Sequence, residues 1–153
     1  GHWEKDTVVS RKGDRSSLAV AQERKSRLIV AQKTETMSPV EHLKTTKIML
    51  SGLTVKSISF DNGIENKNHQ ELGLPTFFCD PYSSWQKGGV ENGNKMIRRY
   101  LPKRTALSEV SQNQIDHIVS IINNKPRKIL GYRTALEVAR QGGVLLENNC
   151  LVS

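Results

Sequence analysis

The sequence lacks several features that would assign it to a common class of protein. Its two cysteines, Cys79 and Cys150, lie far apart in the chain, and neither belongs to a Cys-x-x-Cys pair. A structural zinc site and a disulfide framework are therefore not expected, whereas a reducing, cytoplasmic setting is. No run of about 18 apolar residues occurs, and the N-terminus has no signal-peptide pattern, so no membrane segment is expected.

Sequence motifs of two large enzyme classes are also missing. The chain contains no glycine-rich phosphate-binding loop and no Gly-x-Ser-x-Gly nucleophile turn. It has no internal repeat and no low-complexity linker. Because 153 residues is the size of one domain, we expect a single domain over residues 1–143 and a short C-terminal tail over 144–153.

The chain carries an excess of positive charge. Lysine and arginine number 23 against 15 aspartates and glutamates, which gives a net charge of +8. Basic clusters are dispersed along the sequence, which is typical of a folded surface rather than of a charged tail. Such a surface favours a polyanionic partner, most often nucleic acid, although a basic protein of unrelated function would have the same composition.

The hydrophobic pattern predicts five strands, over residues 3–10, 17–23, 27–32, 55–60 and 76–79. Tight polar turns join the first three, which predicts an antiparallel meander. The last two follow helical segments, which allows parallel pairing. We therefore expect an α/β fold with a mixed five-stranded sheet and helices on its faces.

Helices are predicted over residues 39–50, 69–72, 89–101 and 134–141, and over one further range that follows Ser111. The helix over 39–50 has a serine N-cap followed by proline, and its expected apolar face comprises Val40, Leu43 and Ile48. The helix after Ser111 has capping-box spacing with Gln114 and an apolar stripe of Ile115, Ile118, Val119 and Ile122.

Three carboxylates are the candidate catalytic and metal-binding residues: Asp6, Asp61 and Glu91. Asp6 lies in the first strand, Asp61 follows the fourth, and Glu91 opens a helix. Phosphoryl transfer on nucleic acid commonly uses two Mg²⁺ ions, whose preferred ligands are carboxylate oxygens. Two carboxylates about 4 Å apart repel by roughly 4 kcal/mol at a dielectric constant of 20, so we expect a metal between them or one carboxylate turned away. The glycines before Glu91 make it the one expected to turn away.

The helix of Glu91 carries candidate DNA-binding cations. Glu91, Lys95 and Arg98 share one face, and Met96, Ile97, Tyr100 and Leu101 are expected to pack on the opposite side. Cations beside a metal ligand suit DNA phosphates, although Glu91 and Lys95 also have the spacing of an ordinary surface pair. The candidate DNA-binding residues are Lys87, Lys95, Arg98 and Arg99.

Other residues give weaker signals. Glu4 shares a strand face with Asp6 and is expected either to support it or to be solvated. Trp85 could stack on a base or pack in the structure. Asp80 precedes a proline and is expected in a turn. The four histidines have no metal-ligand spacing.

Five motifs in one order carry a family resemblance. They are His2-Trp3-Glu4-x-Asp6, Asp61-Asn62-Gly63-x-Glu65, Asp80-Pro81-Tyr82-Ser83-x-Trp85-Gln86-x-Gly88, Glu91-Asn92-x-Asn94 and Asn123-Asn124-x-Pro126-Arg127-Lys128-x-Leu130-Gly131-Tyr132. Together they resemble the catalytic core of the IS30-family insertion-sequence transposases, which belong to the retroviral-integrase-like DDE group. The resemblance covers about residues 1–138.

This resemblance implies an RNase H-like fold with Asp6, Asp61 and Glu91 as a metal-binding catalytic triad. It implies hydrolysis at transposon ends followed by attack of a free 3′-hydroxyl on target DNA, with two Mg²⁺ or Mn²⁺ ions. The implied partners are element ends and target DNA, with a homodimer or higher oligomer in the active complex. The implied setting is the bacterial cytoplasm, at the nucleoid. The family's N-terminal helix-turn-helix region is not expected in this chain.

The sequence departs from the family pattern at several positions. Lys5 stands where glycine is usual, Asn66 where phenylalanine is usual, and Ala135 where proline is usual. The stretch between Asp61 and Glu91 is also a few residues shorter than usual. Two alternative functions stay open, namely a metal-dependent RNase H-like nuclease and an inactive DNA-binding remnant.

Overall fold

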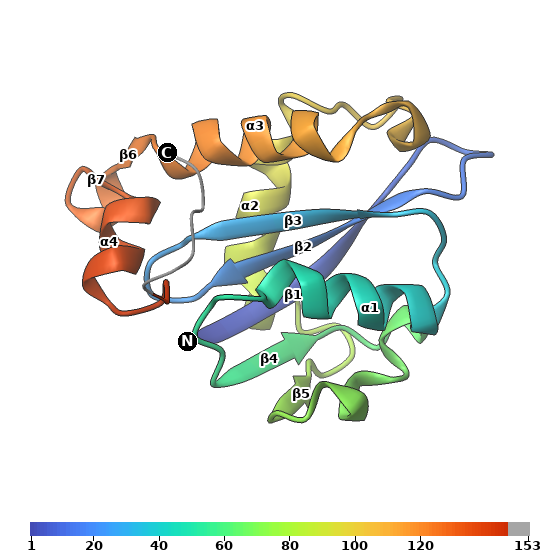
Figure 1. Ribbon diagram of the computed structural model, residues 1–153, viewed down its shortest axis with the longest axis horizontal. Helices are drawn as coiled ribbons and strands as arrows, with labels where there is room; N and C mark the ends of the chain where they lie inside the picture. Colours follow the sequence, from blue (N-terminus) through green and yellow to red (C-terminus); the bar gives the residue numbers. More distant parts are fainter. Residues whose placement is uncertain (147–153) are drawn as a thin grey trace.

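A five-stranded mixed sheet forms the centre of the computed structural model, which describes residues 1–146 (Figure 1). The strands are β1 (His2–Val9), β2 (Ser17–Glu23), β3 (Ile29–Thr34), β4 (Ser57–Phe60) and β5 (Thr76–Phe78). The helices are α1 (Pro39–Leu50), α2 (Gly88–Arg98), α3 (Gln112–Asn123) and α4 (Ala135–Gln141). A small hairpin pairs β6 (Pro126–Arg127) with β7 (Arg133–Thr134), and 3₁₀ turns include η1 (Ile64–Asn66), η2 (His69–Leu72) and η3 (Ser84–Lys87).

The strand order is β3-β2-β1-β4-β5. Strands β1, β2 and β3 pair antiparallel, whereas β1 pairs parallel with β4 and β4 with β5. The expected mixed sheet is therefore confirmed, with the meander on one side and the crossover strands on the other.

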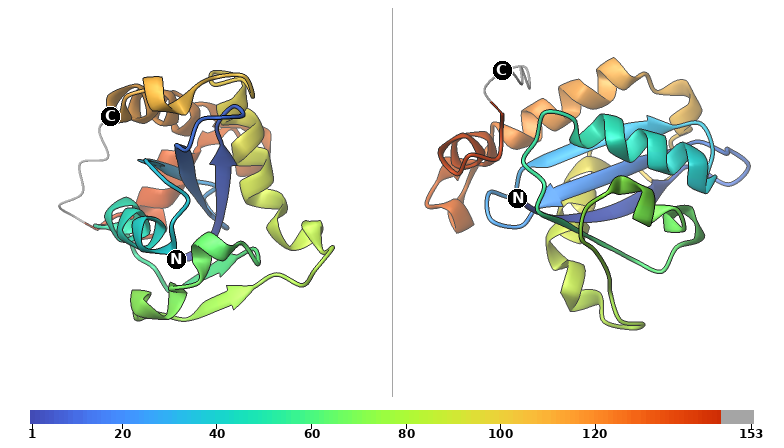
Figure 2. Two further views of the ribbon diagram at one scale, coloured as in Figure 1. Left: turned by 90° about the vertical axis from the view of Figure 1, so that its right-hand side faces the viewer. Right: turned by 60° about the horizontal axis from the view of Figure 1, so that its bottom comes forward.

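Alternation of side chains along the strands divides the core into two layers. On β2, Ala19 and Ala21 pack on the side of α1 and α4, whereas Leu18 and Val20 pack on the side of α2 and α3. Figure 2 shows the sheet between these two groups of helices. Because β1 follows the same alternation, Trp3 belongs to the α1 layer and Val8 to the α2 layer. Asp6, two residues before Val8, therefore faces α2.

Capping residues fix the helix starts as the sequence predicts. Ser38 accepts a hydrogen bond from Glu41 N at the start of α1, and Ser111 and Gln114 form a complete capping box at α3. The expected stripe of α3 is also confirmed, since Ile115 and Ile122 are buried and Ile118 and Val119 pack beside them.

The expected apolar face of α1 is wrong. Val40 is 70% exposed and Ile48 is 54% exposed. The buried face instead comprises His42, Thr45, Thr46, Met49 and Leu50. The helix therefore buries a partly polar face, which hydrophobic periodicity alone does not reveal.

Several boundaries also differ from expectation. Strand β3 begins at Ile29 rather than at 27, because Arg27 has a positive φ of 63° and belongs to the turn. Helix α2 ends at Arg98, and Tyr100 beyond it is 38% exposed rather than packed against the sheet. The hairpin of β6 and β7 was not expected.

The first residues of the expected C-terminal tail join the packed fold. Val144 is buried, and its carbonyl accepts a hydrogen bond from Thr54 N. Leu145 forms a β-bridge with Leu53. Residues 147–153 of the expected tail lie outside the described residues. Within residues 1–146, no helix is long and apolar enough to cross a membrane.

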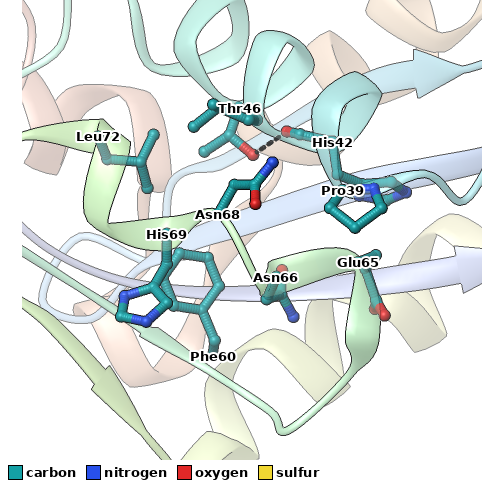
Figure 3. A pocket seen from close by; sticks show the side chains of 10 residues that line it. Pro39, His42, Thr46, Phe60, Glu65, Asn66, Asn68, His69 and Leu72 are labelled. Carbon is teal, nitrogen blue, oxygen red and sulfur yellow. Dashed lines mark hydrogen bonds between the residues drawn. The ribbon is translucent and has the colours of Figure 1, made fainter.

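His42 packs against a small cavity of about 10 Å³, enough for at most one water molecule (Figure 3). The side chain is 1% exposed, and its Nδ1 atom has no hydrogen-bond partner among the described residues. Burial lowers the pKa of His42 to about 4, with the charge of Lys5 adding to the effect and that of Glu65 opposing it.

Acidification is therefore expected to destabilise the fold through His42. The unfolded chain takes up this proton near its ordinary pKa and the folded chain only near pH 4, so stability falls between pH 6.5 and pH 4. The expected loss is of the order of 1–3 kcal/mol. Thermal melts at pH 7 and pH 5 would measure it, and His42→Leu should reduce the difference. An unchanged pH dependence in that variant would contradict the assignment.

Candidate active site

Asp6 and Asp61 lie next to each other on the α2 face of the sheet. Strands β1 and β4 are parallel with Glu4 opposite Ser59, so continuing the register by two residues brings Asp6 opposite Asp61. Both side chains point away from the α1 layer, which holds Ile58 and Phe60. The side chains of Asp6 and Asp61 are 21% and 41% exposed.

One oxygen of Asp6 is held by a helix residue. Asn94, on α2, donates from Nδ2 to Asp6 Oδ2 at 2.8 Å. The other oxygen, Oδ1, lies 3.4 Å from the Lys87 ammonium group. The carboxylate is thus oriented from one side and faces a cation on the other.

The two carboxylate oxygens of Asp61 also have different partners. Its Oδ1 accepts hydrogen bonds from Gly63 N at 3.2 Å and from Asn66 Nδ2 at 3.0 Å. Its Oδ2 lies 3.6 Å from Lys87 Nζ. The turn after β4 therefore fixes the carboxylate and leaves one oxygen directed at the same cation that Asp6 faces.

Lys87 joins the two aspartates. Its side chain is only 11% exposed, and its ammonium group lies between Asp6 Oδ1 and Asp61 Oδ2. A cation at this position offsets the repulsion between the carboxylates, which sequence analysis expected a metal to do. The two oxygens that face Lys87 are hard donors that converge on one cationic position, which fits a divalent metal ion in place of the ammonium group.

Glu91 faces the same region without touching the aspartates. It lies four residues after Lys87 and three before Asn94, both of which contact Asp6, so it shares their side of the helix. Its side chain is exposed. Within residues 1–146, no group of three or more histidine, cysteine, aspartate or glutamate side chains is close enough to hold a metal ion.

Glu4 is buried rather than solvated. Its Oε1 accepts from Arg24 Nε at 2.8 Å, and its Oε2 accepts from Val90 N at 3.0 Å. A carboxylate on a free backbone N–H in the first turn of a helix is favourable. Glu4 therefore anchors the start of α2 to β1 and so fixes the helix that carries Glu91.

The expected DNA-binding cations have different surroundings. Lys95 and Arg99 are exposed, and with Lys103 they line an open groove of about 510 Å³ beside Asn94. Arg98 lines it too, but donates to the carbonyls of Val9, Leu101 and Pro102, and burial lowers its pKa. Lys87 is buried against the aspartates.

A buried polar pair lies behind Asp61 on the opposite face of β1. Lys5 is 1% exposed, and its Nζ donates to Asn66 Oδ1 at 2.8 Å. Burial lowers the pKa of Lys5 to about 8, while Glu65, Asp61 and Asp6 oppose that shift. Asn66 therefore links the Lys5 ammonium group to the Asp61 carboxylate.

Sequence reasoning missed the residues that orient the carboxylates. Asn66 was noticed only as a departure from the family pattern, Asn94 only as a motif residue, and Lys87 only as a DNA-binding candidate. The spacing of Lys87, Glu91 and Asn94 on one helix face was an available signal. Asp80 occupies a turn as expected, where it exchanges hydrogen bonds with Gln86. Trp85 is 76% exposed, so its packing interpretation is wrong.

Comparisons of sequence find relatives over nearly the whole chain. It is 37% identical over 154 residues to the transposase InsI of insertion element IS30A from Escherichia coli K12, covering 96% of this chain and 40% of that protein. It is 36% identical over 148 residues to the transposase of IS1086 from Cupriavidus metallidurans, covering 92% and 43%. The chain thus spans less than half the length of these curated relatives. No family model matches.

Comparisons of structure identify the fold. The catalytic core domain of BIV integrase superposes with a TM-score of 0.71 at 21% identity, covering 92% of this chain and 94% of that one. A chain of the simian T-cell lymphotropic virus intasome, solved with a PP2A regulatory subunit, gives a TM-score of 0.72 at 19% identity, covering 89% and 52%. The RNase H-like fold expected from the sequence is confirmed.

Proposed function

Because the chain is a relative of the IS30-family insertion-sequence transposases over almost its whole length, we propose that it is a DDE transposase catalytic domain. The proposed activity is metal-dependent cleavage of DNA at element ends, followed by transfer of the free 3′-hydroxyl end to target DNA. The observation that carries the proposal is the convergence of Asp6 Oδ1 and Asp61 Oδ2 on one cationic position.

Asp6 and Asp61 would hold a divalent ion at this position, and Glu91 would complete the set by turning inward from the same helix face. When bound, Mg²⁺ or Mn²⁺ supplies activation of the attacking oxygen and stabilisation of the leaving oxygen, in a two-ion arrangement. Asn66 and Asn94 orient the carboxylates, and Glu4 holds α2 against β1.

The exposed cations of α2 suggest where DNA runs. Lys95, Arg99 and Lys103 line the groove next to Asn94, so a phosphate backbone lying there would reach the carboxylates. We infer that DNA is the partner and that two or more copies act together in the active complex. In the bacterial cell, the substrate would be DNA of the nucleoid.

Joining of DNA ends distinguishes the proposed transferase from a nuclease of the same fold. A labelled end duplex with a free 3′-hydroxyl, incubated with a second duplex and Mn²⁺, should give a longer joined product. Cleavage without joining would favour the nuclease. The absence of both reactions, at DNA concentrations that give binding, would favour the inactive remnant.

Replacing Lys87 with methionine should make the fold more dependent on metal. The variant leaves Asp6 and Asp61 facing each other without a cation, which we expect to cost about 1 kcal/mol in EDTA. Metal at ten times its Kd would add about 1.4 kcal/mol, or roughly 3–5 °C in Tm. Melts of both proteins with and without Mn²⁺ measure this, with Lys128→Met as a surface control. If Mn²⁺ changes the Tm of neither the wild type nor Lys87→Met, the result would contradict the metal position.

A further inference from the structure

A second pocket opens beside the carboxylates, between the start of α2, the β2–β3 turn and the β6–β7 hairpin. Its volume is about 530 Å³, which is within the range of small-molecule sites. Gly88 and Gly89, which lie between Lys87 and Glu91, form part of its wall, and Glu4 reaches it from β1. The pocket is therefore adjacent to the candidate metal position but formed by different side chains.

The pocket has an uncompensated positive charge. Three arginines line it, Arg24, Arg27 and Arg127, against the single carboxylate of Glu4, which already pairs with Arg24. Among the described residues neither Arg27 nor Arg127 has an ion-pair partner. Arg127 donates to the carbonyls of Arg27 and Ile122, whereas the guanidinium group of Arg27 makes no hydrogen bond among these residues. These two arginines are close enough that the charge of Arg27 helps to lower the pKa of Arg127, after burial. An anion in the pocket would relieve this repulsion.

Two residues that line the pocket also carry a buried polar atom that lacks a partner among the described residues. Gln22 is 1% exposed, and its Oε1 has no hydrogen-bond partner in the part of the chain that is described. The buried Nε of Arg127 is likewise without one. Such orphan atoms are uncommon in folded proteins. Because both atoms are buried and Gln22 Oε1 lies against Gly93, the open side of the pocket offers the arginine cations rather than these atoms to a ligand.

The rim of the pocket is aromatic and apolar. Trp85 is 76% exposed and Ile129 is 70% exposed, and both line it. An exposed tryptophan beside arginines is the combination that binds single-stranded nucleic acid, where a base stacks on the ring and the phosphate meets the cations. Glycine at position 89 lets Glu4 and Arg27 lie close against the start of α2, since a Cβ there would lie 2.8 Å from Glu4 Oε2 and 3.1 Å from an Arg27 nitrogen.

We propose that this pocket holds one unpaired nucleotide of the DNA, next to the phosphate at the carboxylates. The base stacks on Trp85, and the phosphate is held by Arg27 and Arg127. This inference rests on the proposed function for the identity of the DNA, but binding at the pocket requires no metal and no reaction. A duplex whose end carries unpaired nucleotides should therefore bind more tightly than a blunt one.

Tryptophan fluorescence tests the proposal directly. The chain has two tryptophans, and Trp3 is fully buried, so quenching by DNA reports on Trp85. In EDTA, a duplex with a short single-stranded overhang should quench the fluorescence and bind about tenfold more tightly than the blunt duplex. Equal affinities with no quenching would overturn the proposal.

Variants locate the effect. Arg27→Ala should remove the preference for the overhang, and Trp85→Ala should reduce it, both measured by anisotropy of labelled DNA. Arg140→Ala, an exposed arginine on α4, should keep it. If Arg27→Ala and Arg140→Ala change the preference for the overhang equally, the pocket assignment is overturned. Melting curves verify that each variant is folded. Failure of the joining reaction with an intact overhang preference would instead count against the catalytic function alone.

Discussion

Replacing Asp61 with asparagine is expected to reduce Mn²⁺-dependent DNA cleavage and joining by about a thousandfold. The substitution keeps the size of the side chain and removes the charge that Oδ2 directs at the Lys87 position. Metal charge stabilisation of a phosphoryl-transfer transition state is worth several kcal/mol, and each 1.36 kcal/mol is a factor of ten in rate. Gel assays of labelled DNA at saturating Mn²⁺ would measure the loss.

The fold and DNA binding should survive this substitution. Asparagine can still accept from Gly63 N and from Asn66 Nδ2, which hold the oxygen that is not directed at the cation. Anisotropy in EDTA should therefore give a similar Kd for wild type and Asp61→Asn. Asp116→Asn, on the exposed side of α3, is the matched control. Equal cleavage by Asp61→Asn and wild type would refute the role of Asp61.

Local signals in the sequence predicted the elements that position these residues. The serine caps of α1 and α3 are short-range hydrogen bonds between neighbours in the chain, so spacing alone reveals them. Strand β2 was likewise predicted from its short apolar run, which is typical of a strand buried between two layers. The apolar face of α1 was mispredicted because the helix buries the polar residues His42, Thr45 and Thr46. His42 Nε2 pairs with Ser17 Oγ from β2, and Thr46 Oγ1 donates to the His42 carbonyl within the helix, and hydrophobic periodicity reveals neither contact.

The carboxylates could be located by sequence, but their surroundings could not. Asp6 is 81 residues from Lys87 and 88 from Asn94, and the packing of α2 on the sheet brings them together. The parallel register of β1 and β4 sets Asp6 beside Asp61. No local pattern shows that Glu4 anchors α2 or that Lys87 is buried between two aspartates. These contacts depend on the packing of α2 across the sheet, which is a property of the whole fold.

The two departures from the family pattern nearest the site are in contact. Lys5 stands where glycine is usual and Asn66 where phenylalanine is usual, and the structure joins them by a 2.8 Å hydrogen bond. The usual pair of phenylalanine and glycine is thus replaced by an amide at position 66 in contact with a lysine at position 5. The pair is compensated, and Asn66 still supports Asp61 through its other amide atom. These departures therefore give no reason to expect an inactive site.

Changing Asn66 alone to phenylalanine is expected to destabilise the fold by about 3 kcal/mol. The Lys5 ammonium group would stay buried without its hydrogen-bond partner, and breaking a buried charged contact from one side commonly costs that much. For a chain of this length, the expected fall in Tm is roughly 6–12 °C. Asn113→Phe, at an exposed position on α3, should change stability by less than about 0.5 kcal/mol.

The double variant Lys5→Gly with Asn66→Phe should recover much of this loss, because it removes the buried charge and restores the usual pair. Residues in contact show interaction energies of about 0.5–3 kcal/mol in a double-mutant cycle, and we expect a value in the upper half of that range. Urea unfolding of the wild type, both single variants and the double variant measures it. Additive losses would mean that Lys5 and Asn66 are independent, and Asp61 would then be held by the turn at Gly63 rather than through this pair.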